Sequence, residues 1–256
     1  MRLTRVYVET VLAPGSSVNL PADTASHLAK VLRARSGDEL ILFNGNGEES
    51  YGAIETVRGS HVTASVGDSR PVNKESPLAI TLIQCVPRGD RMDFIVQKAT
   101  ELGVSRIVPI LSQRSVVRLD KRQAESKSMH WKAVAVNACE QCGRNRLPII
   151  DPAQPLLNYL GELAPCKGPC LVFEPTSAAR GEAKAQHAEA TIGTISNAQI
   201  VIGPEGGFAP DELEAFRVAG FSQVGLGPRI LRTETAAIAA LVWLQARFGD
   251  MQMDTL

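Results

Sequence analysis

The sequence predicts an α/β protein in which a small β-rich domain precedes a larger domain with a parallel sheet covered by helices on both faces. From residue 78 onward, apolar runs of strand length alternate with helical stretches, the pattern of such a sheet. Before that point, short strand-like runs are separated by glycine turns. Residues 69–77, SRPVNKESP, are polar with two prolines and predict the linker. We therefore divide the chain into domains 1–72 and 73–256.

The first domain is expected to be a small β-barrel or sandwich with one short helix. Residues 5–9 (RVYVE) alternate like a strand, and residues 23–35 have a helical period, with Asp23 or Thr24 as the cap and Gly37 beyond the end. Further strands are predicted at 39–44 (ELILFN), 50–57 (SYGAIETV) and 61–66 (HVTASV). Their connections, GNG and RGS, supply the positive φ that tight hairpin turns need.

The second domain contains six predicted strands and six predicted helices. The strands are expected at 78–86, 106–111, 147–150, 169–174, 199–203 and 223–227. The helices are expected at 91–103, 126–142, 155–163, 181–195, 210–220 and 234–248. Ligands of open parallel sheets bind beyond the carboxyl ends of the strands, so the loops there are the first places to look for a site.

Two of those loops combine glycine with charged residues. The segment 227–236, GPRILRTETA, leads into the last helix, with Thr233 as the expected N-cap and Glu234 in the first turn. Arg229 and Arg232 do not suit the positive end of a helix dipole, which predicts an anion or polar ligand at this turn. The other loop, PEGGF at 204–208, follows an apolar strand.

Several common chemistries find no support in the motifs. The glycines around residue 205 do not fit the G-x-G-x-x-G fingerprint, and the Walker lysine is missing, which disfavours nicotinamide and nucleoside triphosphate sites. There is no G-x-S-x-G elbow and no HExxH motif. A hydrolase with an activated nucleophile is therefore not indicated.

The cysteine spacing and the lengths of the apolar runs argue against disulfide-rich, zinc-binding and membrane-spanning proteins. An odd number of cysteines argues against a disulfide framework. Cys139 and Cys142 form a CxxC, and Cys166 and Cys170 a CxxxC, but the spacing does not match zinc ribbons, so we expect free thiols and no metal. No 18-residue apolar run and no signal peptide are visible, so we expect no membrane span and a cytoplasmic protein.

Charge is distributed unevenly along a chain whose net charge is zero. Residues 1–146 carry 20 Lys and Arg against 15 Asp and Glu, while the remainder carries 7 against 12. Cations recur at expected loop and helix ends, where phosphate contacts of a nucleic acid would fall. The candidates are Arg88, Arg91, Arg114, Arg118, Arg144 and Arg146. An ordinary solvated surface is the alternative for each of them.

Four motifs in order resemble one known family. They are RMDFIVQKATELGV, ACEQCGR, IGPEGGF and LGPRILRTETA, and HLAKVLRARSGDEL and LFNGNG look like the same family's N-terminal domain. The chain thus resembles the bacterial 16S rRNA (uracil(1498)-N(3))-methyltransferases, which belong to the knotted SPOUT class. The resemblance implies a PUA-like β-barrel at 1–72 that binds RNA, and a SPOUT domain at 73–256 with a C-terminal trefoil knot. It also implies a homodimer that uses S-adenosylmethionine to methylate N3 of one uridine in 16S rRNA of the small ribosomal subunit.

The resemblance also assigns residues. Arg232 is expected to stabilise charge on the uracil oxygens, and Glu234 is either the general base or a partner of Arg232 or the helix dipole. Cofactor-binding residues are expected to be Phe173, Glu174, Gly203, Glu205, Gly207, Leu226, Gly227, Ile230, Leu231 and Thr235.

Two residues depart from the family pattern. Cys142 stands where serine is more frequent, and Ala209 stands where a helix-capping serine is common, which should weaken a cap by about 1 kcal/mol. Two rival functions stay open, a non-catalytic RNA-binding module and a SPOUT enzyme that methylates a ribose 2′-OH or another base.

Overall fold

The chain folds into two compact units. The computed structural model describes residues 3–163, 168–174 and 195–251. The first unit consists of Met1–Glu75 together with Val136–Leu147, and the second of Ser76–Ala135 and Pro148–Leu256. The sequence predicts an end of the first domain at residue 72 and places residues 136–147 in the second domain. Most of the predicted helix at 181–195 lies outside the described residues, as does Cys166.

The first unit is built on a five-stranded sheet with one helix. The elements are β1 (Thr4–Tyr7), β2 (Ser17–Asn19), α1 (Ala22–Lys30), β3 (Glu39–Phe43), β4 (Glu48–Arg58) and β5 (His61–Pro71). The strand order is β1-β3-β4-β5-β2, with β1 parallel to β3 and the other pairs antiparallel. Alternate residues such as Leu40, Leu42 and Val62 point into one buried cluster, as the period of two predicts. The predicted strands are present, and β2 is an addition.

Helix α1 is shorter than predicted. It ends at Lys30, and the predicted helix extended to residue 35. The chain turns at Arg33, which has a left-handed backbone with φ of 52°. The helix buries Ala25 and Leu28, whereas Leu32 one turn later is exposed. Because α1 buries no residue beyond Leu28, a longer helix would gain no stabilisation from tertiary packing.

The second unit contains a seven-stranded parallel sheet. Its strands are β6 (Ala79–Cys85), β7 (Arg106–Leu111), β8 (Ile149–Ile150), β9 (Gln154–Pro155), β10 (Cys170–Phe173), β11 (Asn197–Ile202) and β12 (Ser222–Val224). The order is β12-β10-β11-β6-β7-β8, with β9 also on β7, and every pair is parallel. The six strands predicted for this domain are all found, which confirms the α/β reading.

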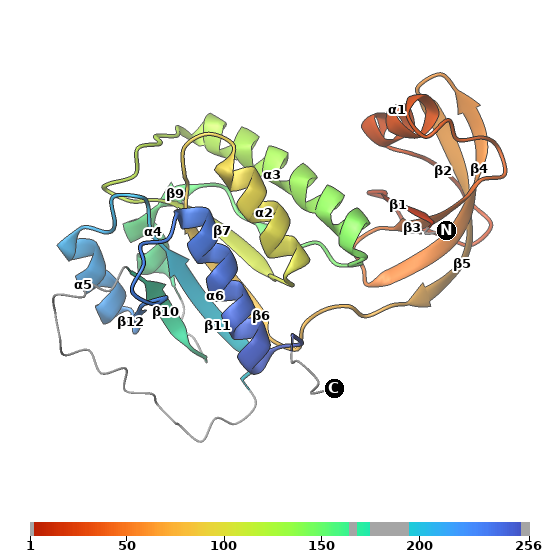
Figure 1. Cartoon of the computed structure of the whole chain (residues 1–256). Helices are drawn as coiled ribbons and strands as arrows, with labels where there is room; N and C mark the ends of the chain where they lie inside the picture. Colours follow the sequence, from red (N-terminus) through yellow and green to blue (C-terminus); the bar gives the residue numbers. More distant parts are fainter. Residues whose placement is uncertain (1–2, 164–167, 175–194, 252–256) are drawn as a thin grey trace. The chain divides into compact units, whose positions relative to one another are not determined.

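Helices cover both faces of this sheet (Figure 1). They are α2 (Arg91–Glu101), α3 (Lys121–Cys142), α4 (Leu156–Glu162), α5 (Pro210–Val218) and α6 (Thr233–Phe248). On one face, Ile80 and Leu82 of β6 belong to a cluster with α2, α6 and the first part of α3. On the other face, Ile83 and Cys85 join a cluster with α4 and α5. Each fully buried Leu or Ile contributes about 1.5–3 kcal/mol of transfer free energy, so this double cover stabilises the sheet.

The parallel arrangement gathers three loops at one edge of the sheet. Neighbouring strands β12, β10 and β11 end at Val224, Phe173 and Ile202. The segments that follow them, 225–232, Glu174 and 203–209, therefore meet at the carboxyl edge. These include both loops for which the sequence predicts a ligand site, 204–208 and the segment that begins at Gly227.

Candidate cofactor and RNA site

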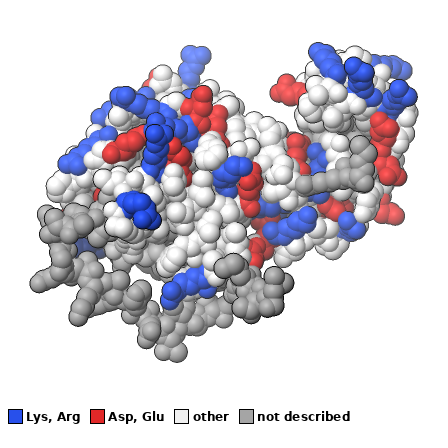
Figure 2. Space-filling view, viewed as in Figure 1, with Lys and Arg blue, Asp and Glu red and all other residues white. Residues whose placement is uncertain are grey.

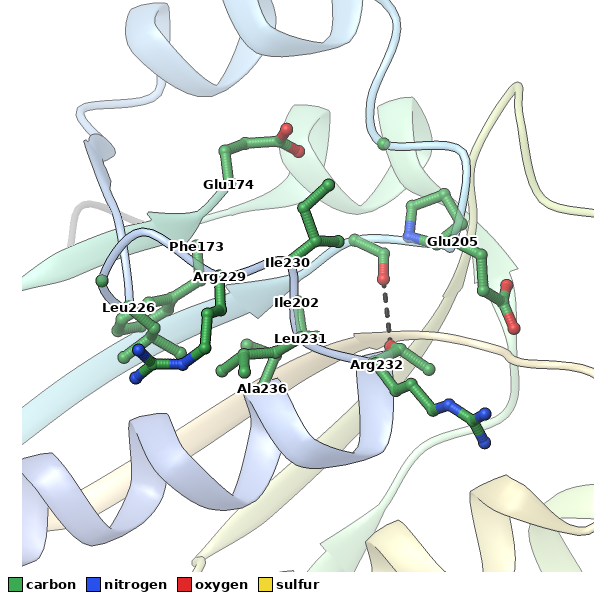
Figure 3. A pocket seen from close by; sticks show the side chains of 15 residues that line it. Phe173, Glu174, Ile202, Glu205, Leu226, Arg229, Ile230, Leu231, Arg232 and Ala236 are labelled. Atoms are coloured by element: carbon green, nitrogen blue, oxygen red, sulfur yellow. Dashed lines mark hydrogen bonds between the residues drawn. The ribbon is translucent and has the colours of Figure 1, made fainter. Parts of the chain in front are cut away.

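A cavity of about 260 Å³ lies at this edge, between the loops that follow β11 and β12. Figure 3 shows Phe173 and Leu226 at one end of it and Glu205 and Arg232 at the other. Its apolar wall is formed by strand ends, loop residues and the first turn of α6. The lining residues are Phe173, Glu174, Ile202, Gly203, Pro204, Glu205, Gly207, Leu226, Gly227, Arg229, Ile230, Leu231, Arg232, Thr233 and Ala236.

Glycines allow the loops to approach the cavity. Gly207 and Gly227 have φ of 66° and 81°, values at which a side chain would be strained. A Cβ on Gly203 would lie 3.1 Å from the Phe208 ring and 3.4 Å from Glu174 Oε1. The two loops thus expose backbone to the cavity at positions where larger residues would be strained or crowded.

A hydrogen bond joins the loop after β11 to the start of α6. The Thr233 hydroxyl donates to the Gly203 carbonyl over 3.0 Å, the contact drawn in Figure 3. Thr233 was predicted to be the N-cap of the last helix, and this was wrong. The cap position belongs to Arg232, and Thr233 is the first helical residue, with its hydroxyl turned to the neighbouring loop.

Glu174 is one of two glutamates that line the cavity, the other being Glu205. Glu174 follows β10, and its Oε1 accepts a hydrogen bond from the backbone N–H of Phe208 at 3.4 Å. Burial raises the pKa of Glu174 above its ordinary value, although the Phe208 N–H and the charge of Arg114 act in the opposite direction. A half-buried carboxylate with an open side suits a ligand that offers hydroxyl or amino donors.

The residues at the start of α6 differ in their exposure. Arg229 and Arg232 are exposed, and Figure 3 shows their guanidinium groups at opposite ends of the cavity. Glu234 is half-buried and does not line the cavity, and its Oε2 has no hydrogen-bond partner among the described residues. No ion pair between Arg232 and Glu234 is found in the described part of the chain, so the structure gives no support to the counter-ion alternative.

Two of the predicted RNA-binding arginines contact the loop after β11. The Arg91 guanidinium pairs with Glu205 at 2.5 Å, and Arg114 Nη1 donates to the Gly206 carbonyl at 3.1 Å. Arg118 is exposed and donates to the Gln113 carbonyl at 3.3 Å, and Arg88 is exposed as well. On the face seen in Figure 2, Lys and Arg gather over the region where the loop between β7 and α3 runs in Figure 1. The cations and the cavity therefore share one edge of the second unit.

Arg144 does not belong to an exposed cationic surface. It is 4% exposed, and its guanidinium makes a two-point contact with Glu75, with Nη2–Oε2 and Nε–Oε1 distances of 2.5 and 3.1 Å. Its charge is neutralised inside the first unit, which argues against the phosphate contact expected for it. Arg146 is exposed and lies against the Gly47 turn of the same unit.

Nine of the ten predicted cofactor residues line the cavity, and Thr235 does not. Thr235 is exposed in the first turn of α6. Ile202, Pro204, Thr233 and Ala236 line it without having been expected there. Pro204 could have been found, because it stands inside the PEGGF motif. Predicting Ala236 would have required knowing which side of α6 faces the cavity, and the predicted N-cap at Thr233 was displaced by one residue.

The part of the chain that the structure describes holds no group of three His, Cys, Asp or Glu suited to a metal ion. Within the same residues, no helix is long and apolar enough to cross a membrane. Cys139 and Cys142 lie in α3, in agreement with the prediction that ACEQCGR is helical.

Two family profiles match the chain and define its class. Residues 74–245 match the RNA methyltransferase domain, and residues 20–66 match the RNA methyltransferase PUA domain. The fold and the cavity are therefore those of an RNA methyltransferase with an N-terminal PUA-like domain.

Relatives and solved structures narrow this class. A protein of Buchnera aphidicola from Schizaphis graminum, named ribosomal RNA small subunit methyltransferase E, is 32% identical over 98% of both chains. A Neisseria gonorrhoeae structure of the same name, bound to S-adenosylmethionine, is 34% identical with a TM-score of 0.83, and covers 98% of this chain and 100% of that one. A methyltransferase of Legionella pneumophila in complex with the same cofactor is 35% identical, with a TM-score of 0.88 and the same coverage. The chain belongs to the family of ribosomal RNA small subunit methyltransferase E.

Proposed function

We propose that this protein transfers a methyl group from S-adenosylmethionine to N3 of one uridine, position 1498, of 16S ribosomal RNA. The observation that carries the proposal is the cavity between the loops 203–208 and 226–232, lined by nine of the ten residues expected to hold the cofactor. The bound cofactor in the Legionella and Neisseria relatives, and the name of the latter, support the same activity. We propose in addition that the second unit contains the C-terminal trefoil knot of the SPOUT class.

The residues present fit this cofactor. Phe173, Leu226 and Leu231 provide an apolar wall for the adenine, and the glycine backbones permit a close approach. Glu174 is placed to accept from a ribose hydroxyl or an amino group. The cofactor supplies an electrophilic methyl group when it is bound. Holding that group and the uracil in one orientation accounts for a large part of the acceleration.

Two residues at the start of α6 are assigned to the uracil. N3 lies on the Watson–Crick edge, so the base must leave its stack to react. The exposed Arg232 guanidinium lies at the end of the cavity near Glu205, where it can stabilise negative charge on the uracil oxygens. The N3 proton has to leave as the bond to carbon forms. Glu234 in the first turn of α6 is the proposed acceptor, and because it does not line the cavity and its Oε2 is buried, it would take the proton through a water or after a movement of its side chain.

Nucleoside analysis tests the reaction itself. In 16S rRNA from a strain lacking this gene, mass spectrometry is expected to show loss of N3-methyluridine, and the purified protein with S-adenosylmethionine should restore it on small subunits. Loss of a 2′-O-methylated nucleoside instead would assign the protein to a different SPOUT reaction. Unchanged nucleosides in the deletion strain would leave the non-catalytic RNA-binding module as the better account.

We propose that Arg88, Arg91, Arg114 and Arg118 form the RNA-facing edge of the second unit, and Arg146 a contact of the first. Arg91 and Arg114 also contact Glu205 and Gly206 in the loop 203–208, which lines the cavity. RNA that contacts these two arginines would therefore lie beside the bound cofactor. Arg144 is left out because of its buried pair with Glu75.

Neutralising Arg114 and Arg118 together is expected to weaken RNA binding and flatten its salt dependence. Each phosphate contact contributes about 0.7–0.9 to the slope of log K against log salt, so the double Gln variant should reduce the slope by about 1.5. Binding titrations at several salt concentrations measure this. Arg217→Gln serves as the control, since Arg217 is exposed on α5 and pairs with Glu214. An equal slope in the double variant and wild type would exclude both arginines as phosphate contacts.

Replacing Glu174 by Gln is expected to weaken cofactor binding without lowering the stability of the ligand-free protein. Because the pKa of Glu174 is raised in the folded protein, the wild type loses stability as the pH rises through the interval between the ordinary and raised values. The Gln variant lacks this loss, so the ligand-free variant should be at least as stable as wild type at pH 7.5. Its affinity for S-adenosylmethionine should fall, on the order of tenfold, because a charged acceptor is lost. Thermal unfolding and calorimetry measure the two quantities, and an unaltered affinity would remove Glu174 from the cofactor site.

We also propose that the protein is a homodimer in the cytoplasm, where ribosomal subunits are assembled. Apolar side chains are exposed on the second unit, with Ile230 at 83% and Trp243 of α6 at 42%. Such a surface is typical of a contact with a second copy. Sedimentation equilibrium is expected to give twice the chain mass, and Trp243→Glu is expected to shift it toward the monomer. A monomeric wild type at micromolar concentration would contradict this part.

A further inference from the structure

A polar side chain lies buried in the apolar strand β6, on the face that packs against α6. Gln84 is fully buried, although its neighbours along the strand are apolar core residues. Its Nε2 donates to the Thr233 hydroxyl and to the Cys85 carbonyl, both at 2.9 Å. Its Oε1 has no partner among the described residues. A buried acceptor without a partner costs stability, so this position is not optimised for stability alone.

The contact with Gln84 determines what the Thr233 hydroxyl can do. The amide nitrogen of Gln84 can only donate, so the hydroxyl oxygen of Thr233 acts as its acceptor. The single hydroxyl hydrogen is then free for the Gly203 carbonyl, which lies 3.0 Å away. The direction of both hydrogen bonds is therefore fixed, from Gln84 through Thr233 to Gly203.

This relay joins three parts of the site at their base. Gly203 begins one cofactor loop, Thr233 follows the other at the start of α6, and Gln84 anchors both to the central sheet. Gly203 and Thr233 line the cavity, whereas Gln84 does not. With its carbonyl engaged by Thr233, the Gly203 peptide plane is fixed, and so is the spacing between the two loops.

We propose that Gln84 is a positioning residue for the cofactor and acts through Thr233 on the Gly203 peptide. The inference rests on the proposed function, since it names S-adenosylmethionine as the ligand of the cavity. Gln84 holds the two loops at the separation that the ligand needs and touches neither the ligand nor the uracil.

The test compares cofactor affinity, turnover and stability in four variants. In Gln84→Met and Thr233→Val, the dissociation constant for S-adenosylmethionine should rise on the order of tenfold. In Gln84→Met, whose side chain does not line the cavity, kcat at saturating cofactor should stay within about twofold. The unfolding temperature of Gln84→Met should stay near that of wild type, because an unpaired acceptor leaves the core together with the lost donor. Thr233→Ser keeps the hydroxyl and should keep the affinity.

Thr100→Val is the matched control. Thr100 is a fully buried threonine of α2 whose hydroxyl donates to the Val96 carbonyl at 2.7 Å, away from the cavity. This variant loses a buried hydroxyl in the same way as Thr233→Val, and its affinity for the cofactor should equal that of wild type.

The outcomes separate this inference from the proposed function. Wild-type protein that fails to bind S-adenosylmethionine contradicts the function itself. Wild-type binding together with unchanged affinity in Gln84→Met and Thr233→Val overturns the relay alone. Equal losses of affinity in Thr233→Val and Thr100→Val would also overturn it, because the effect would then reflect general destabilisation.

Discussion

Replacing Arg232 by alanine is expected to lower kcat for methyl transfer by about 10²–10³-fold. The guanidinium is exposed at the rim of the cavity, in the cap position of α6, where it can meet charge that develops on the uracil as N3 loses its proton. That charge is absent from the bound ground state, so the loss should appear in kcat rather than in the binding constants. Single-turnover methylation of small subunits with labelled cofactor measures it.

Two controls accompany this variant. Arg217→Ala removes an exposed arginine on α5 that is paired with Glu214, and it should retain wild-type turnover. Calorimetry with S-adenosylmethionine should show that Arg232→Ala binds the cofactor as wild type does. Turnover of Arg232→Ala within a few fold of wild type would remove this residue from the chemistry.

Replacing Glu49 by glutamine is expected to lower the free energy of unfolding of the first unit by about 3 kcal/mol. Glu49 is 4% exposed and bridges two arginines, with an Oε2 to Arg5 Nη1 distance of 2.6 Å and an Oε1 to Arg70 Nη2 distance of 2.8 Å. Arg5 is buried too and also contacts the Asn145 side chain. Removal of the carboxylate charge leaves the Arg5 cation in the interior without its counter-ion, and denaturant unfolding reports the cost.

The same chemical change on the surface provides the control. Glu214→Gln breaks the exposed pair with Arg217, which should alter stability by less than about 0.5 kcal/mol. If Glu49→Gln were no more harmful than Glu214→Gln, the buried cluster would not be what stabilises the first unit.

The pH dependence of the Glu49 effect has a definite sign. Burial alone would raise the pKa of Glu49, but hydrogen bonds from Arg70 and Arg5 outweigh it and hold the pKa below the ordinary 4.5. A carboxylate with a lowered pKa contributes stability above its unfolded value and loses it as the pH falls through the folded value. The difference between wild type and Glu49→Gln should therefore be full at neutral pH and shrink below about pH 4.5.

Local periodicity was sufficient to predict the sheet of the second unit and the edge at which the cavity lies. Buried parallel strands are continuous apolar runs, and their carboxyl ends share one edge, so the loops at 204–208 and 228–232 could be placed together in advance. The exposed arginines beside them, Arg114 and Arg118, follow from the same reasoning.

Side-chain partners that are distant in sequence could not be predicted in this way. Arg144 appeared to be a surface cation, yet its partner Glu75 lies 69 residues earlier in the chain. The assignment of Val136–Leu147 to the first unit likewise depends on contacts such as Tyr7 N–H to Glu140, which no local pattern reveals. Threonine is a residue type that often caps helices, but the Thr233 hydroxyl donates to the Gly203 carbonyl, which is distant in sequence.

A crystal structure of the protein with S-adenosylmethionine would locate the cofactor relative to the two loops. We expect the adenine against Phe173 and Leu226, the cofactor between the loops 203–208 and 226–232, and its methyl group directed toward the Arg232 end of the cavity. Density for the cofactor at another place, or none between these loops at a saturating concentration, would contradict this expectation.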